Sequence, residues 1–180
     1  MELRQTRRTF KREMDVQALG EFLWLACRSR SSRPSPFGPN QESRPHPSAG
    51  ALHPIHVLLG RGGPLLSRYD PALHALMEVL GSEAGAVEAI RAASSSLELG
   101  QGWVIALVAE PGKTGSKYEH PDSLVLRDAG VVLGYMSMVA EALGLAFCPL
   151  GITGEGRITQ GLTTSAQELR GVGLAVVGRE

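Results

Sequence analysis

A basic segment near the start of the chain carries groups suited to binding phosphate. It reads RQTRRTF over residues 4–10. Arg4 and Arg8 are four positions apart, a spacing that predicts one shared helical face with the hydroxyl of Thr6 between them. The planar guanidinium group matches the oxygens of a phosphate in geometry and charge. The segment therefore indicates a local anion site, and the simpler alternative is a solvated basic stretch without a ligand.

A second segment, RPHPSAGALHP over residues 44–54, has the composition of a ligand-contacting turn. Its prolines stiffen the chain, and the small residues Ser48, Ala49 and Gly50 let backbone amides approach a flat or anionic ligand. The alternative is an ordinary turn that leads into a strand. Its two histidines have no third group at metal-ligand spacing, so we expect no metal site.

A third candidate is the adjacent pair Lys117 and Tyr118. Both side chains can exchange a proton in general acid–base catalysis when their surroundings favour the required form. They stand in the polar, Gly-rich stretch GKTGSKYEHPD over residues 112–122. The alternative is therefore a lysine in a surface loop with no catalytic role.

The elements that must position these groups follow from apolar periodicity and from turn residues. Asp70 as N-cap and Pro71 at the first helical position predict the start of one helix. Residues 29–48, rich in Ser, Pro, Arg and Asn, indicate a long irregular loop. The expected helices cover 14–28, 70–80, 83–99, 123–144 and a short stretch within 163–171; the expected strands cover 49–60, 102–109, 145–152 and 171–178.

This order predicts an α+β fold, with a helix-rich shell over one sheet, in a single domain over residues 1–180. The formal net charge of +0 argues against nucleic acid or an anionic membrane surface as partner. The apolar runs are too short to predict a membrane span, and the first residues lack the apolar core of a secretion signal. Cys27 and Cys148 are distant in sequence, which favours a reducing, cytoplasmic setting.

The motifs together resemble the nitroreductase superfamily. RQTRRTF is similar to its RRSxRxF opening, and RPHPSAGALHP resembles the RPxPSAGALYP signature of its SagB-type dehydrogenase branch, whose members oxidise azolines in ribosomal peptides to azoles. Further along, SRYDPALHAL resembles YDPxxHxL, Lys117-Tyr118 resembles KYG, and DAGVVLGYMSMVAEALGLAFCPLG resembles EAGHxxQNLxLAAxALGLGxxPxG. The five matches occur in the expected order and cover nearly the whole chain.

The resemblance implies a central mixed or antiparallel sheet flanked by helices, in an intertwined homodimer with two FMN sites built from both subunits. It implies three groups of FMN contacts. The phosphate or ribityl chain would be held by Arg4, Thr6, Arg8 and Arg179; the isoalloxazine would be contacted from the other subunit by Pro47, Ser48, Ala49 and Gly50; and backbone near flavin N5 would come from Pro149, Leu150 and Gly151.

The resemblance also implies an activity. The protein would be an FMN-dependent dehydrogenase or oxidase that converts a peptide azoline to an azole, with Lys117 and Tyr118 as the catalytic dyad and a cyclodehydratase as pathway partner. Two alternatives remain open. One is an NAD(P)H-dependent nitro- or quinone reductase, and the other is a flavin-binding subunit that needs a companion protein, as in cyclic-dipeptide oxidases.

Overall fold

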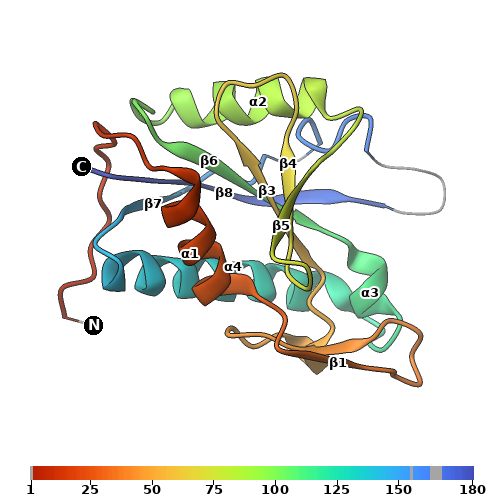
Figure 1. Cartoon of the computed structure of the whole chain (residues 1–180). Helices are drawn as coiled ribbons and strands as arrows, with labels where there is room; N and C mark the ends of the chain where they lie inside the picture. The colour runs from red at the N-terminus through yellow and green to blue at the C-terminus, as the bar shows by residue number, and fades with distance from the viewer. Residues whose placement is uncertain (1, 155, 163–167) are drawn as a thin grey trace.

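The computed structural model describes residues 2–154, 156–162 and 168–180. The described chain forms four α-helices, a short 3₁₀ helix and eight strands (Figure 1). In chain order these are α1 (Val16–Cys27), β1 (Ser31–Arg33), β2 (Gln41–Ser43), η1 (Ala49–Ala51), β3 (Ile55–Gly60), β4 (Ser67–Asp70), β5 (Ala75–Glu78), α2 (Glu83–Ser94), β6 (Trp103–Ala109), α3 (Pro111–Gly115), α4 (Pro121–Ala142), β7 (Ala146–Leu150) and β8 (Arg170–Gly178).

Six strands form one antiparallel sheet in the order β5-β4-β3-β6-β8-β7. The central pairs are the longest. β3 and β6 are in register from Ile55 opposite Ala109 to Gly60 opposite Val104, and β6 and β8 pair along their length with one irregularity after Leu107. A separate two-stranded ribbon, β1–β2, lies below the sheet in the view of Figure 1, and β2 contacts η1.

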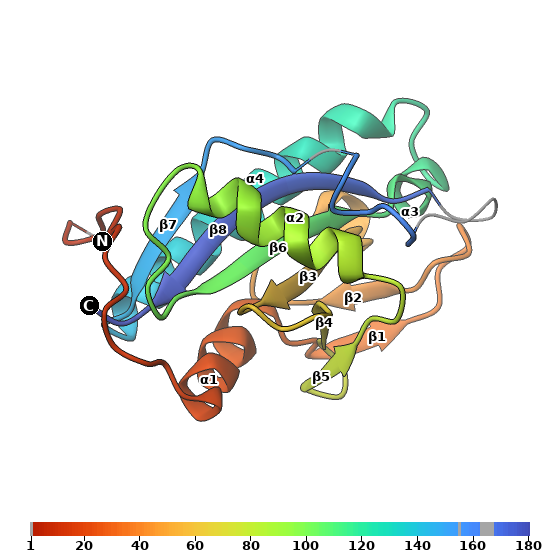
Figure 2. The ribbon, with the colours of Figure 1, turned by 90° about the horizontal axis from the view of Figure 1, so that it is seen from above.

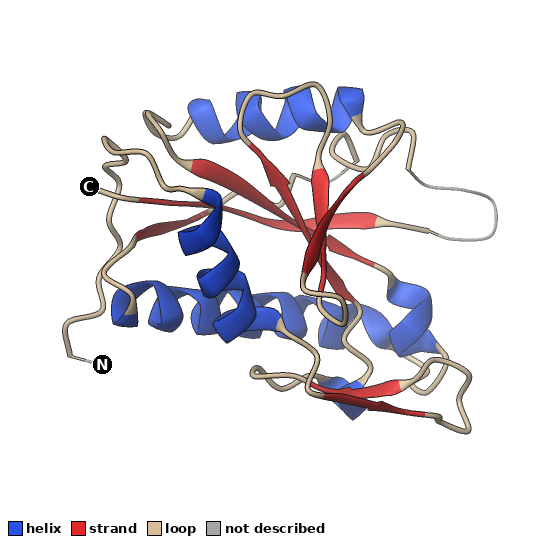
Figure 3. Ribbon diagram, in the orientation of Figure 1, coloured by secondary structure: helices blue, strands red, loops and turns tan. Residues whose placement is uncertain are grey.

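Helices cover both faces of the sheet (Figure 2, Figure 3). The alternation of side chains along β6 explains why both faces are apolar. Ile105 and Leu107 pack with α1 and α4, whereas Val104 and Ala106 pack with α2. The prediction of an α+β fold with one helix-flanked sheet is confirmed, and the sheet is antiparallel throughout the described residues.

The predicted helix over residues 70–80 is wrong. The segment forms β4, a turn and β5, with Asp70 opposite Ala75. The Asp70 carboxylate does accept hydrogen bonds from the amides of Ala72 and Leu73, both at 3.0 Å. An Asp-Pro sequence can begin a turn as readily as a helix. The pairing of β4 with β3 stabilises the hairpin over the helix.

Other expectations were wrong in part. The loop over 29–48 contains the β1–β2 ribbon, and the strand expected from 49 begins at Ile55 after η1. The polar stretch after residue 110 contains α3, which was not predicted. Of the helix-compatible stretch 163–171, residues 163–167 lie outside the described residues and the chain joins β8 at Arg170.

α4 is the long core helix. Within the described residues it alone has the length and apolar character to cross a membrane, and it packs against α1, α3, β7 and β8. Its buried side chains include Val132 and Met136. Contact with so many elements accounts for its apolar composition as part of a core.

Candidate functional site

The turn that precedes β3 has an unusual backbone. We call residues 47–50 the PSAG turn. Gly50 has φ +63°, and the non-glycine residues Ala51 and His53 follow with φ +59° and +47°. Left-handed conformations cost free energy in residues with a side chain and persist where the surroundings hold them, often at functional sites. The strain is therefore a reason to examine what holds this turn.

Asp128 on α4 holds the PSAG turn. Its carboxylate accepts a hydrogen bond from the Ser48 hydroxyl at 2.5 Å and from the Ala49 amide at 3.1 and 3.2 Å. The Ser48 oxygen in turn accepts a hydrogen bond from the His53 amide at 3.0 Å. Asp128 is buried, at 6% exposure. Bonds of this charge-assisted kind in a buried setting fix the turn against the N-terminal half of α4.

Lys117 and Tyr118 lie directly against Gly50. A Cβ atom built on Gly50 would lie 3.1 Å from Lys117 Cδ, 3.1 Å from the Tyr118 hydroxyl and 3.2 Å from Lys117 Nζ. The pair follows α3, where the carbonyl of Thr114 accepts both of their amides. The Lys117 ammonium lies 5.1 Å from the ring centre of Phe37. Two segments far apart in sequence thus form one half-buried cluster.

Two neutral histidines lie behind this turn. Burial lowers the pKa of His46 to about 4 and that of His53 to about 3, so both are uncharged at neutral pH. Their rings meet edge to face at 5.1 Å. His53 Nε2 lies 3.0 Å from the carbonyl oxygen of Glu42, and its buried Nδ1 has no partner in the described structure. Both line a cavity of about 480 Å³ with Pro47 and Ser48.

The N-terminal basic segment has neither helical nor strand structure, so the predicted helical face for Arg4 and Arg8 is wrong. The segment runs beside the start of β7, where the Arg7 amide donates to the Phe147 carbonyl at 3.1 Å. This tertiary bond explains why the helical spacing was misleading.

The arginines of this segment have different partners. Arg7 forms a bidentate ion pair with Glu141 at 2.6 and 3.2 Å, which raises the pKa of Arg7 and lowers that of Glu141. Arg4 reaches only the Ser137 hydroxyl, at 3.4 Å. Arg8 faces the buried Cys148 thiol and forms no ion pair within the described chain. Arg4 and Arg8 therefore retain charge for a ligand.

The remaining predicted contacts lie at the same edge of the molecule. Arg179 forms an isolated bridge with Arg12, whose amide donates to the Arg179 carbonyl at 3.2 Å. Pro149 and Leu150 end β7, and a Cβ on Gly151 would meet nothing within 4 Å. Both chain ends pass this edge (Figure 1). The residues that the resemblance assigns to phosphate and to flavin N5 thus lie along one edge strand.

The residues along this edge have the chemical groups that FMN requires. Its phosphate is anionic and needs cations such as the exposed Arg4 and Arg8, and its ring needs close, backbone-lined walls such as Pro149–Gly151. The PSAG turn lies elsewhere in the protomer. It contacts Asp128 and Arg4 contacts Ser137, about nine residues or about 14 Å further along α4. The predicted FMN contacts therefore form two groups, at different halves of α4.

Sequence reasoning missed two residues of the site. Asp128 was not singled out, although a carboxylate within an apolar helix was a usable signal, because such a group needs partners. Gln41, whose side-chain amide donates to the Gly50 carbonyl at 3.0 Å, lies in a polar segment with no distinguishing pattern. No group of three or more His, Cys, Asp or Glu side chains within the described ranges is placed to hold a metal ion.

Comparison with known proteins gives a family and a set of similar folds. The model described as "Nitroreductase family" matches residues 2–179. No curated protein sequence matches the chain. Similar solved structures include the Escherichia coli microcin synthetase McbBCD complex with truncated pro-MccB17 bound, with 19% identity, TM-score 0.74 and coverage of 98% of this chain and 69% of the other.

Two further structures are similar. A nitroreductase-type protein from Ralstonia eutropha JMP134 has 19% identity and TM-score 0.71, covering 99% of this chain and 80% of the other. A Desulfovibrio desulfuricans protein of the same type was solved in complex with FMN. It has 14% identity and TM-score 0.55, and the match covers 99% of this chain and 82% of the other. At identities this low, the structural similarity shows a shared fold and nothing more.

Proposed function

The chain belongs to the nitroreductase family, and on this premise we propose that it is an FMN-dependent oxidoreductase that dehydrogenates a peptide azoline to the azole. The observation that carries the proposal is the contact of Gly50 with Lys117 and Tyr118. This contact supports the proposal, because Lys117 and Tyr118 would then lie against the turn that would contact the isoalloxazine. The McbBCD complex, which has a similar fold and was solved with truncated pro-MccB17 bound, supports a peptide substrate.

FMN would lie along the edge that carries the free arginines. Arg4 and Arg8 would bind the phosphate, with Arg179 beside them and the Thr6 hydroxyl as an additional donor. Arg7 would not take part, because Glu141 already neutralises it. The backbone of Pro149, Leu150 and Gly151 would flank the ring, and Pro149 and Gly151 are exposed residues. The FMN complex of the Desulfovibrio protein supports this cofactor.

The protein groups would perform the proton chemistry. Oxidation of an azoline to an azole removes one proton and one hydride, and bound FMN would supply the hydride acceptor. Lys117 or Tyr118 would accept the proton from the substrate Cα. Asp128 would keep the PSAG turn against this pair, so that the turn and the base hold a constant separation.

A second copy of the chain would complete the site. The arginines and the PSAG turn contact different halves of α4, so a homodimer in which one protomer's PSAG turn meets its partner's edge strand would join them. A pathway partner such as a cyclodehydratase would supply the azoline. Light scattering during gel filtration tests whether the protein is a homodimer. A monomer that binds FMN and turns over substrate would contradict the proposed dimer.

A peptide carrying one thiazoline provides the test. Aerobic incubation with the FMN-loaded protein should lower the mass of the peptide by two hydrogens. Lys117→Ala and Tyr118→Phe should each slow the reaction by about 10²-fold or more at unchanged FMN content, whereas Arg91→Ala, at an exposed ion pair on α2, should not. Rapid reduction of the flavin by NADPH without azoline oxidation would favour a nitro- or quinone reductase instead.

A further inference from the structure

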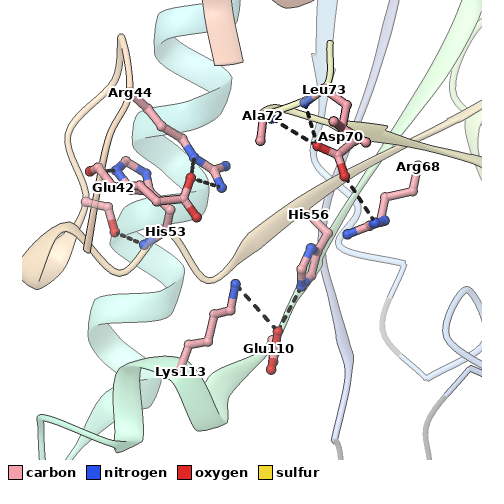
Figure 4. A network of polar contacts seen from close by, with 11 residues as sticks. Glu42, Arg44, His53, His56, Arg68, Asp70, Ala72, Leu73, Glu110 and Lys113 are labelled. Carbon is pink, nitrogen blue, oxygen red and sulfur yellow. Dashed lines mark hydrogen bonds and ion pairs between the residues drawn. The ribbon is translucent and has the colours of Figure 1, made fainter. Parts of the chain in front are cut away.

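A cavity separate from the proposed flavin edge is lined by residues from five elements, and several of these residues are charged. It has a volume of about 190 Å³ and lies between the end of α1, β2, β3, β4 and α3. Its walls carry three cations and two carboxylates, and Figure 4 shows them grouped around His56. The charged lining residues are Glu42, Arg44, Arg68, Asp70 and Lys113. No proposed FMN contact belongs to this lining.

The cations of this cavity have hydrogen-bond donors that are not fully engaged. Arg44, only 9% exposed, directs both Nε and Nη2 to the same Glu42 oxygen, at 3.0 and 2.9 Å. Arg68 reaches Asp70 only at 3.7 Å, and Lys113 reaches Glu110 only at 3.8 Å. These separations exceed hydrogen-bond length. Partly buried cations with unused donors favour an anion as an additional partner.

The carboxylates are more fully occupied than the cations. Asp70 accepts the amides of Ala72 and Leu73. Glu110 accepts from His56 Nε2 at 3.0 Å and pairs with Lys113. Each cation thus has one carboxylate nearby, and the hydrogen-bond donors of the cations remain less fully engaged than the oxygens of the carboxylates.

The uncharged part of the lining limits what can enter. Ile55 and Val57 contribute apolar wall. Burial raises the pKa of Cys27 and of Tyr69 to about 12, so neither adds a negative charge at neutral pH. The volume is below the roughly 300–1,000 Å³ of pockets for drug-sized ligands. The space suits one small group with an apolar body and an anionic end.

We propose that this cavity binds a small monocarboxylate, through Arg44, Arg68 and Lys113. A carboxylate would accept the hydrogen bonds that these three cations leave unmade, whereas a dianion would be repelled more strongly by Glu42, Asp70 and Glu110. The source is either a free carboxylic acid or the C-terminal carboxylate of a peptide. The Glu42 carbonyl also lies against His53, so the ligand would bind beside the segment that leads from the PSAG turn into β3.

Isothermal titration of the full-length protein with N-acetylglycine tests the proposal. We expect saturable binding, and binding of the neutral N-acetylglycinamide at least about tenfold weaker. Arg68→Gln and Lys113→Gln should each weaken N-acetylglycine binding about tenfold. Arg91→Gln, remote on α2 and paired with Glu88, is the control and should bind as the parent protein does. Thermal unfolding of each variant establishes that it is folded.

The source of the carboxylate is resolved by a tripeptide with a free C terminus and by its amidated form. Binding of the free-acid tripeptide as tight as that of N-acetylglycine assigns a peptide terminus, and binding of N-acetylglycine alone assigns a free acid. Equal binding of acid and amide, unchanged affinity in both pocket variants, or tighter binding of inorganic phosphate would each overturn the proposal. The titration measures carboxylate binding and does not depend on FMN content. Its result is therefore independent of the proposed redox function.

Discussion

Replacement of Gly50 by alanine probes the contact between the PSAG turn and the Lys117–Tyr118 pair. The backbone contribution follows from φ +63°, which costs an L-residue about 1–2 kcal/mol. The new Cβ would lie 3.1 Å from Lys117 Cδ and from the Tyr118 hydroxyl, so those atoms must move by a few tenths of an ångström. Crowding of this kind adds about 1 kcal/mol. The total destabilisation should be about 2–3 kcal/mol.

Gly62→Ala is the matched control. Gly62 has φ +77° and an added Cβ would meet nothing within 4 Å, so this variant carries the backbone cost without the contact. Urea unfolding should place Gly50→Ala about 1 kcal/mol below Gly62→Ala in stability. The displaced pair should also slow azoline oxidation about tenfold in Gly50→Ala alone. Equal stability and equal turnover in the two variants would refute the claim that Lys117 and Tyr118 need a glycine at position 50 to keep their positions.

Three further predictions concern the supports of the site. Asp128→Ala leaves the hydroxyl and amide of the PSAG turn without their acceptor and should cost about 2–4 kcal/mol of unfolding free energy in urea; an unchanged value would mean that the turn is held by other contacts. The folded-state pKa values of His46 and His53, about 4 and about 3, lie below the unfolded value near 6.5, so the unfolded chain takes up protons first as pH falls. Stability should therefore drop by about 2 kcal/mol per histidine between pH 7 and pH 5, and a flat profile would contradict their burial as neutral rings. Arg8→Ala should weaken FMN binding by about 1.5–3 kcal/mol in a fluorescence titration, whereas Arg7→Ala should lower thermal stability and leave FMN affinity largely intact; the reverse pattern would reassign the two arginines.

Elements with strong periodicity could be predicted from the sequence. α4 and β6 were expected within two residues of their observed bounds, because β6 is apolar over its whole length and α4 has a long, mostly apolar helical pattern. The Asp70-Pro71 signal was ambiguous by contrast. The aspartate makes the same bonds to following amides in a turn as in a helix cap, and only pairing with a distant strand separates the two.

The site residues were named from their types and from the resemblance, and their roles stay predictions. The small residues of the PSAG turn predict close approach of a ligand; the structure shows that Lys117 and Tyr118, from a segment far along the chain, lie against Gly50. The spacing of Arg4 and Arg8 suggested a helix, whereas the segment has no helical structure and its Arg7 amide donates to the distant Phe147 carbonyl. Contacts between distant segments leave no local pattern, which is also why the charged cavity beside His56 was not expected.

The visible absorption spectrum of the purified protein, with the chromophore released by heat and identified, tests the central claim most directly. The account predicts flavin absorption bands and release of FMN, with uptake of added FMN when the protein is isolated without it. A colourless protein that also fails to bind added FMN would contradict the account.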